Sequence, residues 1–382
     1  MISQFVEQRF NLSTWKVNRL TQFLLLAVTM LTYSIMAMNI ANSLFLSNAG
    51  AEYLPLSFIF LGLFSTLAYG GVSQVVDRFS RVRLFQYTLI ASAVLFTIFS
   101  LLLGLNTIAL YFFISITAFF QFDLYINILY PNLITDYFTT LEYKRYAPFF
   151  GIAQAVGILL GGTLTTLLAQ YLNDRQLLGC VVLIFGIAIA QVVYLETSQT
   201  RLESNYANKR IGVLESLKTF PDLVKRYPLV FYLASSSFLF ILIYVMSEFL
   251  WFSTYASHFT NSELTSFLGQ VRIATSTTQM VTLFCITRPL LRWLGVTRMN
   301  VAYPIVTLAA LTGFALRGDL KSAIALKVEM ANKGIFNCCA NVRAVATPMR
   351  VPVKLPGPLA TAIKARSDQV CGAINSCNRL CR

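Results

Sequence analysis

The sequence predicts an all-α membrane protein, a bundle of about nine or ten transmembrane helices. Of its 382 residues, 56% are hydrophobic and only 12% are charged, and the mean hydropathy is +0.65. A soluble domain carries about 25% charged residues. The uncharged runs reach the roughly 20 residues that a helix needs to cross a bilayer. No alternating ten-residue pattern of a β-barrel is present, so these runs are expected to be helices.

Each expected span is an apolar run that ends at charged or turn-forming residues. The first run is too long for a secretory signal core, and no small-residue cleavage site follows a short apolar stretch, so it is expected to remain as a helix. The expected spans are Leu20–Leu46, Leu56–Val76, Leu84–Leu105, Ile108–Tyr130, Gly151–Leu172, Leu177–Leu195, Pro228–Phe252, Thr265–Thr287 and Asn300–Leu316, with a weaker tenth at Leu320–Phe336.

Lysine and arginine are concentrated in alternate connections between the spans. If residues 1–19 lie inside, the inner connections hold 17 of these basic residues and the outer connections hold three. Basic residues stay on the cytoplasmic side, so the amino terminus is expected inside. The net charge of +14 then follows from topology. The expected partner is the lipid bilayer and not a nucleic acid, and the sequence gives no oligomeric state.

The order of the segments predicts a duplicated architecture. A cytoplasmic segment (1–19) precedes six spans (20–195), a basic central loop (196–227) and a second, incomplete set of spans (228–336). The first helix of each set, and the basic turn after its second helix, recur at an offset of about 210 residues. Such an offset is typical of parallel-repeat transporters. The alternative is that a chain with many spans shows these spacings by coincidence.

The connection between the second and third spans carries the stretch Ser-Gln-Val-Val-Asp-Arg-Phe-Ser-Arg (73–81). It resembles the loop motif G-x-x-x-D-R-x-G-R of the major facilitator superfamily, with serine in place of both glycines. The resemblance implies a facilitator-like bundle and a gating role for Asp77, Arg78, Arg81 and Arg83, which would form a latch that breaks as the two halves rock. The alternative is that the arginines only set orientation in the membrane.

Further stretches resemble the ATP/ADP translocase (nucleotide transporter) branch of that superfamily and its bacterial relatives. They are residues 136–151 followed by Gly157 and Gly161-Gly162, residues 48–55, Phe267-Leu268-Gly269, and residues 290–295. The resemblance covers roughly residues 20–336. It implies a secondary-active transporter of an anionic organic solute in a bacterial inner membrane, with nucleotide exchange as the antiport activity. Residues 38–43 carry no charge where characterised translocases carry several, so ATP/ADP exchange rests on the resemblance alone.

Two features of the fifth span have a direct physical interpretation. The spacing Gly157-x-x-x-Gly161 is typical of close helix packing, and contact with a solute is the alternative. Pro148, just before the apolar run, is expected to lie in the first turn of the helix.

Polar side chains at membrane depth are costly, so they are the candidates for the solute path. They are Asn39, Asn42, Asp123, Asn127, Glu248, Arg272, Lys327, Glu329 and Lys333. Arg272 has the donors to bind an anion, and its alternative is an internal salt bridge to Glu248 or Asp123. Asp123 is a candidate proton site, or else hydrogen-bonds Asn127. Glu329 and Lys333, four residues apart, are expected to neutralise each other. The facilitator resemblance implies that helices one, four, seven and ten line the cavity.

Nothing in the sequence organises catalysis. The chain has one histidine, and it has no nucleophile elbow, phosphate loop or paired cysteine spacing of a metal site. An enzyme, a bound metal and a cofactor are therefore not expected, and Cys180 and Cys285 are expected to be packing thiols. The competing class is a degenerate membrane protein that does not transport and serves as an anchor or interaction partner.

Residues 337–382 differ sharply in composition from the rest of the chain. No Phe, Tyr or Trp follows Phe336, and five of the seven cysteines lie in this tail. It contains no apolar run of spanning length, so the last two helices of a facilitator fold are not expected. We interpret the tail as disordered or as the product of a shifted reading frame. The alternative is a cytoplasmic appendage.

Overall fold

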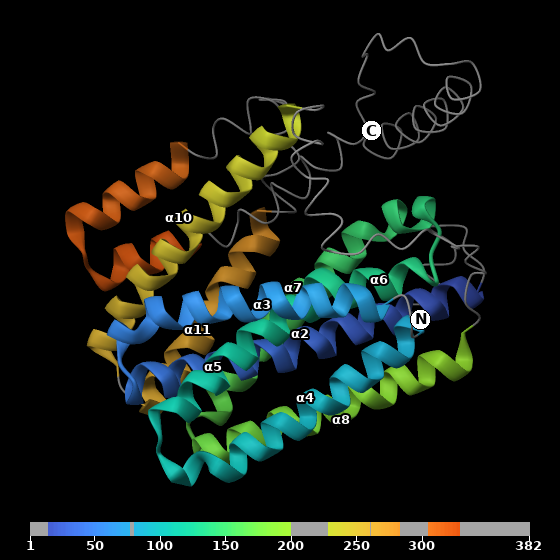
Figure 1. The fold of residues 1–382 in the computed structure, drawn as a ribbon, viewed down its shortest axis with the longest axis horizontal. Coiled ribbons are helices and arrows are strands. Elements are labelled where there is room, and N and C mark those ends of the chain that lie inside the picture. The colour runs from blue at the N-terminus through green and yellow to red at the C-terminus, as the bar shows by residue number, and fades with distance from the viewer. Residues whose placement is uncertain (1–13, 77–79, 200–227, 260, 283–304, 329–382) are drawn as a thin grey trace.

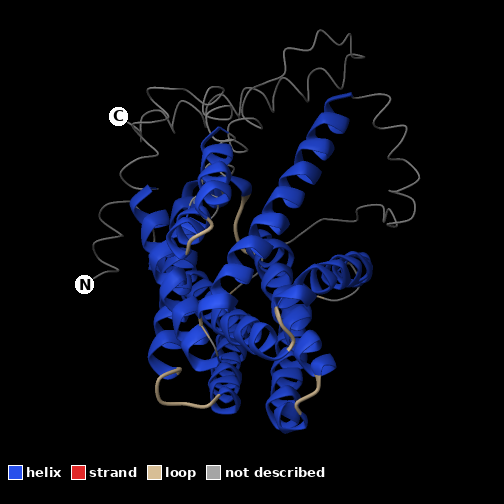
Figure 2. Ribbon diagram, turned by 90° about the vertical axis from the view of Figure 1, so that its left-hand side faces the viewer, coloured by secondary structure: helices blue, strands red, loops and turns tan. Residues whose placement is uncertain are grey.

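The computed structural model describes residues 14–76, 80–199, 228–259, 261–282 and 305–328. In these ranges the regular structure is helical and contains no strand (Figure 2). Five described helices are long and apolar enough to cross a membrane by length and composition, in agreement with an all-α, multi-pass integral membrane protein. They are Trp15–Asn48, Arg81–Leu105, Ile108–Thr135, Phe149–Leu168 and Asp174–Ser198.

Helix α2 (Thr14–Asn48) is the centre of the first group of helices. Its most apolar stretch is 78% buried, against 22% to 39% for the other four spans. The reason is that α2 packs against α5 (Ile108–Asp123), α7 (Thr140–Leu168), α8 (Asp174–Ser198) and α11 (Asn261–Val281). The first predicted span is therefore the core of the bundle and not a lipid-facing helix.

The remaining helices of the first group pack around this centre. α3 (Leu54–Val76) lies against α5, and α4 (Arg81–Leu102) lies along α8 (Figure 1). Short 3-10 turns at Ala51–Tyr53 (η1) and Leu103–Leu105 (η2) precede α3 and α5. The outer faces of these helices carry large exposed apolar side chains, such as Leu183 of α8 at 72% exposure. Such faces are suited to contact with lipid.

The second group begins with α10 (Pro228–His258) and α11, followed by helices at Ile305–Arg317 and 320–328. Gly318 makes the turn between these last two with a φ of 62°, a backbone conformation that favours glycine. α11 packs along α7 and against α2, so it joins the second group, yellow to orange in Figure 1, to the first.

The fifth span begins earlier than predicted. The prediction placed Pro148 in its first turn, but α7 begins at Thr140, so Pro148 lies within the helix. The start is set by a capping box. The Glu142 N–H donates to the Thr139 hydroxyl at 3.3 Å, and the Thr139 N–H donates to the Glu142 carboxylate at 3.2 Å. Hydropathy missed this start because the first turns of α7 are polar.

The fourth span is not a uniform α-helix. It continues to Thr135, beyond the predicted end at Tyr130, and contains a π-helical segment, Leu124–Leu129 (η3), between α5 and α6 (Tyr130–Thr135). Pro131 lies in the first turn of α6. Proline has no N–H, and its ring crowds the carbonyl four residues earlier, which explains a widened turn directly before it.

The other described spans agree with the prediction apart from shifts at their ends. Several predicted features lie outside the described residues, namely Asp77, Arg78, Glu329, Lys333, Cys285, most of the central loop 196–227 and the whole tail 337–382.

Glycines on two sides of α7 allow close helix contact. Added Cβ atoms at Gly157 and Gly161 would lie 2.6 Å from Leu31 Cβ and 2.8 Å from the Thr32 carbonyl oxygen of α2, which confirms the packing interpretation. On another side, Gly162 meets Gly269 of α11. We call this contact the glycine crossing.

Hydrogen bonds reinforce the glycine crossing. The Thr166 hydroxyl of α7 donates to the Ser266 carbonyl at 3.2 Å, and the Ser276 hydroxyl of α11 donates to the Ala155 carbonyl at 2.8 Å. Hydroxyl bonds to a neighbouring helix backbone are typical of membrane helix pairs with small residues between them. The two helix groups are therefore joined backbone to backbone along α7 and α11.

Gly269→Ala should lower the free energy of unfolding by about 1 to 3 kcal/mol. The added methyl group would lie 2.7 Å from the Gly162 carbonyl oxygen and would press on the Thr166 hydroxyl. The matched control is Gly186→Ala in α8, where an added Cβ meets nothing within 4 Å. Thermal unfolding of the two variants in detergent micelles measures the difference. Equal midpoints would show that the glycine crossing is not tightly packed.

Candidate functional site

A small cavity lies where the first and second helix groups meet. Its polar lining comes from both groups: Asn39 and Asn42 of α2, Arg272 of α11, and Lys327 of the helix at 320–328. The cavity has a volume of about 10 Å³, enough for roughly one water molecule. The structure thus brings together four predicted solute-path residues from three separate helices.

The apolar part of the lining is mostly aromatic. Trp251, Phe252 and Tyr255 of α10 line the cavity, and Leu268 and Val271 of α11 lie beside them. All five are at most 5% exposed. A mostly apolar wall with a few polar groups is typical of a small-molecule site.

Lys327 is compensated by partners on α10. Its ammonium lies 3.6 Å from the Glu248 carboxylate, and both side chains are at least 93% buried. The same ammonium lies 3.9 Å from the centre of the Trp251 ring, a cation–π contact. The Tyr244 hydroxyl donates to the Glu248 carboxylate at 3.3 Å. Glu248 therefore neutralises Lys327 next to the cavity.

Arg272 lacks a compensating acid among the described residues. The sequence left open a salt bridge from Arg272 to Glu248 or Asp123, but the ion pair of Glu248 is with Lys327. In the described part of the chain no acid lies within ion-pair distance of Arg272. Among the described lining residues, the guanidinium is therefore the cation that no acid pairs with.

Two buried donors of residues in the cavity wall also have no acceptor within the described part of the chain. Trp251 and Tyr255 are at most 1% exposed. Neither the Trp251 Nε1 nor the Tyr255 hydroxyl finds a hydrogen-bond partner among the described residues. Buried donors without an acceptor are costly, so their position next to Arg272 in the lining indicates a place for a group with acceptor oxygens.

The remaining candidates take two different positions. Asn39 is buried and donates from its amide to the Thr165 hydroxyl of α7 at 3.4 Å. Asp123 and Asn127 do not line the cavity. The Asn127 amide donates to the Asp123 carboxylate, so the hydrogen-bonded alternative is the one that the structure contains.

The sequence search missed the aromatic face of α10, although a signal was present. The signal is a spacing of three or four residues along Tyr244, Glu248, Trp251 and Tyr255, with Phe252 four residues after Glu248. This spacing places the five side chains on one side of a helix. Only Glu248 was selected, because the search was for polar groups at membrane depth. Extending it to aromatic residues on the same helical face would have found the wall of the cavity.

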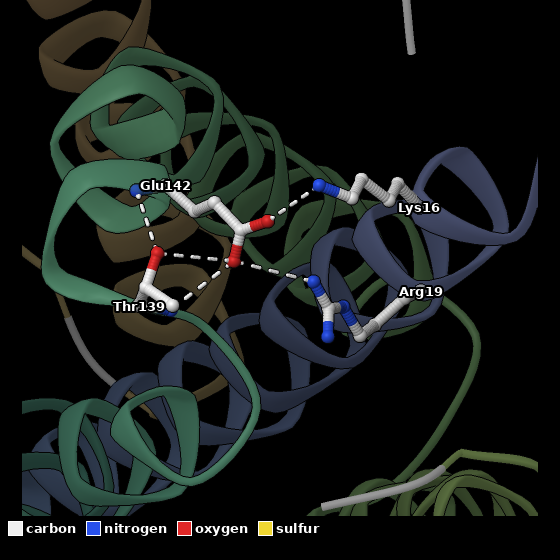
Figure 3. Close-up of polar contacts among 4 residues, drawn as sticks. All are labelled: Lys16, Arg19, Thr139 and Glu142. Carbon is white, nitrogen blue, oxygen red and sulfur yellow. Dashed lines mark hydrogen bonds and ion pairs between the residues drawn. The ribbon is translucent and has the colours of Figure 1, made fainter. Parts of the chain in front are cut away.

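A second charge cluster lies at one end of the bundle, where α2 and α7 begin. Glu142 accepts from Lys16 at 3.0 Å and from Arg19 at 3.4 Å, in addition to its capping contacts with Thr139 (Figure 3). The Arg19 guanidinium is buried and lies 4.7 Å from the centres of the Trp15 and Phe138 rings. This cluster ties α2 to α7.

The described gating-loop candidates also pair within the first group. Arg81 at the start of α4 lies 2.7 Å from the Asp136 carboxylate, just after α6, and donates to the Thr135 hydroxyl at 2.7 Å. Arg83 lies 3.7 Å from the Glu196 carboxylate near the end of α8. Among the described residues these two arginines thus pair within the first half, and a latch across the two halves stays a prediction.

Partial burial acts to raise the pKa of the Glu142 carboxyl, but hydrogen bonds from Lys16 and the Thr139 backbone, with the charge of Arg19, bring the pKa below its ordinary value of 4.5. A carboxyl with a lowered pKa stabilises the folded state above its unfolded pKa. That contribution is lost as the pH falls through the folded pKa.

Comparison with known proteins finds similarity among solved structures. No family model matches the chain, and no curated protein matches it. Among solved structures, a match is found to a bacterial homolog of the human lysosomal transporter Spinster, in an inward-facing and unoccupied conformation. The match covers 94% of this chain and 78% of that chain, at 16% sequence identity and a TM-score of 0.48. A likeness at this level assigns neither a substrate nor a family.

Glu142→Gln should destabilise the protein at neutral pH by about 1 kcal/mol, a value kept small because the cluster is partly exposed to solvent. Glutamine retains the capping contact, so the loss reports the charge pairing with Lys16 and Arg19. The difference from the wild type should shrink as the pH falls below 4.5, the ordinary pKa of a glutamate, and vanish once the wild-type carboxyl is protonated.

Thermal unfolding in detergent across this pH range checks the Glu142 prediction. Glu263→Gln, at an exposed position in α11, is the control and should follow the wild type throughout. A pH-independent deficit in Glu142→Gln would rule out the charge pairing as its cause.

Proposed function

We propose that this protein is a secondary transporter that moves an organic anion across a membrane by alternating access, in a helix bundle of the major facilitator type. The observation that carries the proposal is Arg272, a half-buried cation that lines a small cavity between two helix groups, with no acid in ion-pair distance in the described part of the chain. A guanidinium binds carboxylates and phosphates through its fork of donors.

The position of the cavity supports alternating access. Residues of α2 form one part of its wall, and residues of α10, α11 and the helix at 320–328 form the other. At about 10 Å³, the enclosed volume holds about one water and no organic solute. A solute enters when the two groups separate on one side, and it leaves when they separate on the other. The glycine crossing is the place about which the groups rock.

Nucleotide exchange is the specific form of this proposal that the sequence resemblance implies, in a bacterial inner membrane. Arg272 supports it, since a phosphate oxygen can accept from the guanidinium in the lining. The proposal involves no chemical step on the solute. Among the described residues no group of three His, Cys, Asp or Glu side chains is placed to hold a metal ion.

Uptake into proteoliposomes tests the function. Purified protein is reconstituted, and the entry of labelled ATP, ADP and small organic carboxylates is measured with and without a counter-solute inside. Arg272→Gln should lower uptake at least about tenfold, because the charged contact to the anion is lost.

The matched control for the uptake assay is Arg175→Gln at the start of α8, since Arg175 does not line the cavity. It should transport like the wild type. A folded wild-type protein that moves none of these solutes would refute the transport proposal and favour a membrane anchor.

A further inference from the structure

We propose that the solute of this cavity carries a single negative charge and is a monocarboxylate with an apolar body. The inference rests on the proposed transport function and specifies its substrate class. It follows from the number of charges in the cavity wall, the two unpartnered donors and the character of the remaining lining.

The described lining residues and the acid paired with them carry a net charge of plus one. Arg272 and Lys327 line it as cations, and Glu248 neutralises Lys327 through the ion pair at 3.6 Å. The Trp251 ring, at 3.9 Å, holds the same ammonium. Asp123 lies outside the lining, and its carboxylate accepts from Asn127. Of the two cations in the described lining, Arg272 is thus the one that remains to bind the solute.

A carboxylate matches the donors beside Arg272. The planar guanidinium offers paired N–H groups in the geometry of a carboxylate. Trp251 and Tyr255 line the same cavity, and neither the Trp251 Nε1 nor the Tyr255 hydroxyl has an acceptor among the described residues. Two carboxylate oxygens have enough lone pairs to accept from all three side chains. Binding then satisfies two buried donors and the half-buried charge of Arg272 together.

A second negative charge on the solute would have no cationic partner among the described lining residues. A phosphate monoester carries about 1.5 to 2 negative charges at neutral pH, and a nucleoside triphosphate carries more. In an enclosed, largely apolar site an uncompensated charge is strongly disfavoured. To compensate it, Lys327 would have to leave Glu248, which would leave that buried carboxylate unpaired instead. The charge count therefore favours a monocarboxylate over a nucleotide.

The rest of the lining fits an apolar body. Phe252, Leu268 and Val271 present only hydrocarbon to the cavity. The amides of Asn39 and Asn42 lie on the α2 side and are suited to one neutral polar group of the solute. The lining thus combines the Arg272 guanidinium with apolar side chains.

Matched pairs of anions that differ by one carboxylate test the inference. Binding of 3-phenylpropionate and phenylsuccinate, and of hexanoate and adipate, is measured at neutral pH from the thermal stabilisation of the purified protein, alongside ATP. The wild type should bind each monocarboxylate at least about tenfold more tightly than its dicarboxylate partner. ATP should bind more weakly still.

Removing the acid of the cavity should reverse this preference. Glu248→Gln frees Lys327 and raises the net charge of the wall to two, so each dicarboxylate should bind more tightly than its monocarboxylate partner. The matched control, Glu196→Gln, removes an acid paired to Arg83 away from the cavity and should keep the wild-type order. If Glu248→Gln does not fold, Arg272→Gln, with no charge left for the solute, should bind neither member of a pair.

The outcomes separate this inference from the proposed function. Dicarboxylates or ATP binding to the wild type as tightly as the monocarboxylates would overturn the single charge while leaving anion transport intact. Wild-type order retained in Glu248→Gln would also overturn it, because the cavity charge would not set the preference. Protein that binds none of the anions would overturn both proposals.

Discussion

A charge that is buried at membrane depth must be compensated, and this constraint organises the site. Lys327 is held twice, by the Glu248 carboxylate at 3.6 Å and by the Trp251 ring at 3.9 Å. Both partners are on α10, so satisfying the lysine fixes the helix at 320–328 against α10 and turns the aromatic face of α10 toward the cavity. Arg272 lacks such a partner in the described part of the chain, and that difference gives the cavity its proposed affinity for anions.

The same constraint acts differently at the end of the bundle, where the charges reach solvent. Lys16 and Arg19 pair with Glu142, and Arg81 pairs with Asp136. Each such pair contributes about 0.2 to 1 kcal/mol, but together they connect the helices of the first group to one another. The glycine crossing connects that group to the second by backbone contact. Ion pairs thus connect helices within the first group, while close backbone contact at the glycine crossing joins this group to the second.

Hydropathy was sufficient for the all-helical membrane fold, because the cost of unpaired backbone groups in lipid leaves few alternatives for apolar runs of this length. The start of α7 was missed because it depends on a capping box outside the apolar run. The polar residues that converge on the cavity were found from their depth alone. Their pairing was not, because the choice between Arg272 and Lys327 as the partner of Glu248 depends on how the helices are rotated and tilted against one another.

The burial of α2 bears on how the protein is made. Its most apolar stretch is 78% enclosed by other helices, and it carries the buried polar residues Asn39 and Asn42. α7, which packs along it, begins at Thr140 and so leaves the ribosome much later. Until then the Asn39 amide lacks its partner, the Thr165 hydroxyl of α7. The final packing of α2, the earliest described helix, is therefore a late event in biogenesis, because it requires α7 to enter the bilayer.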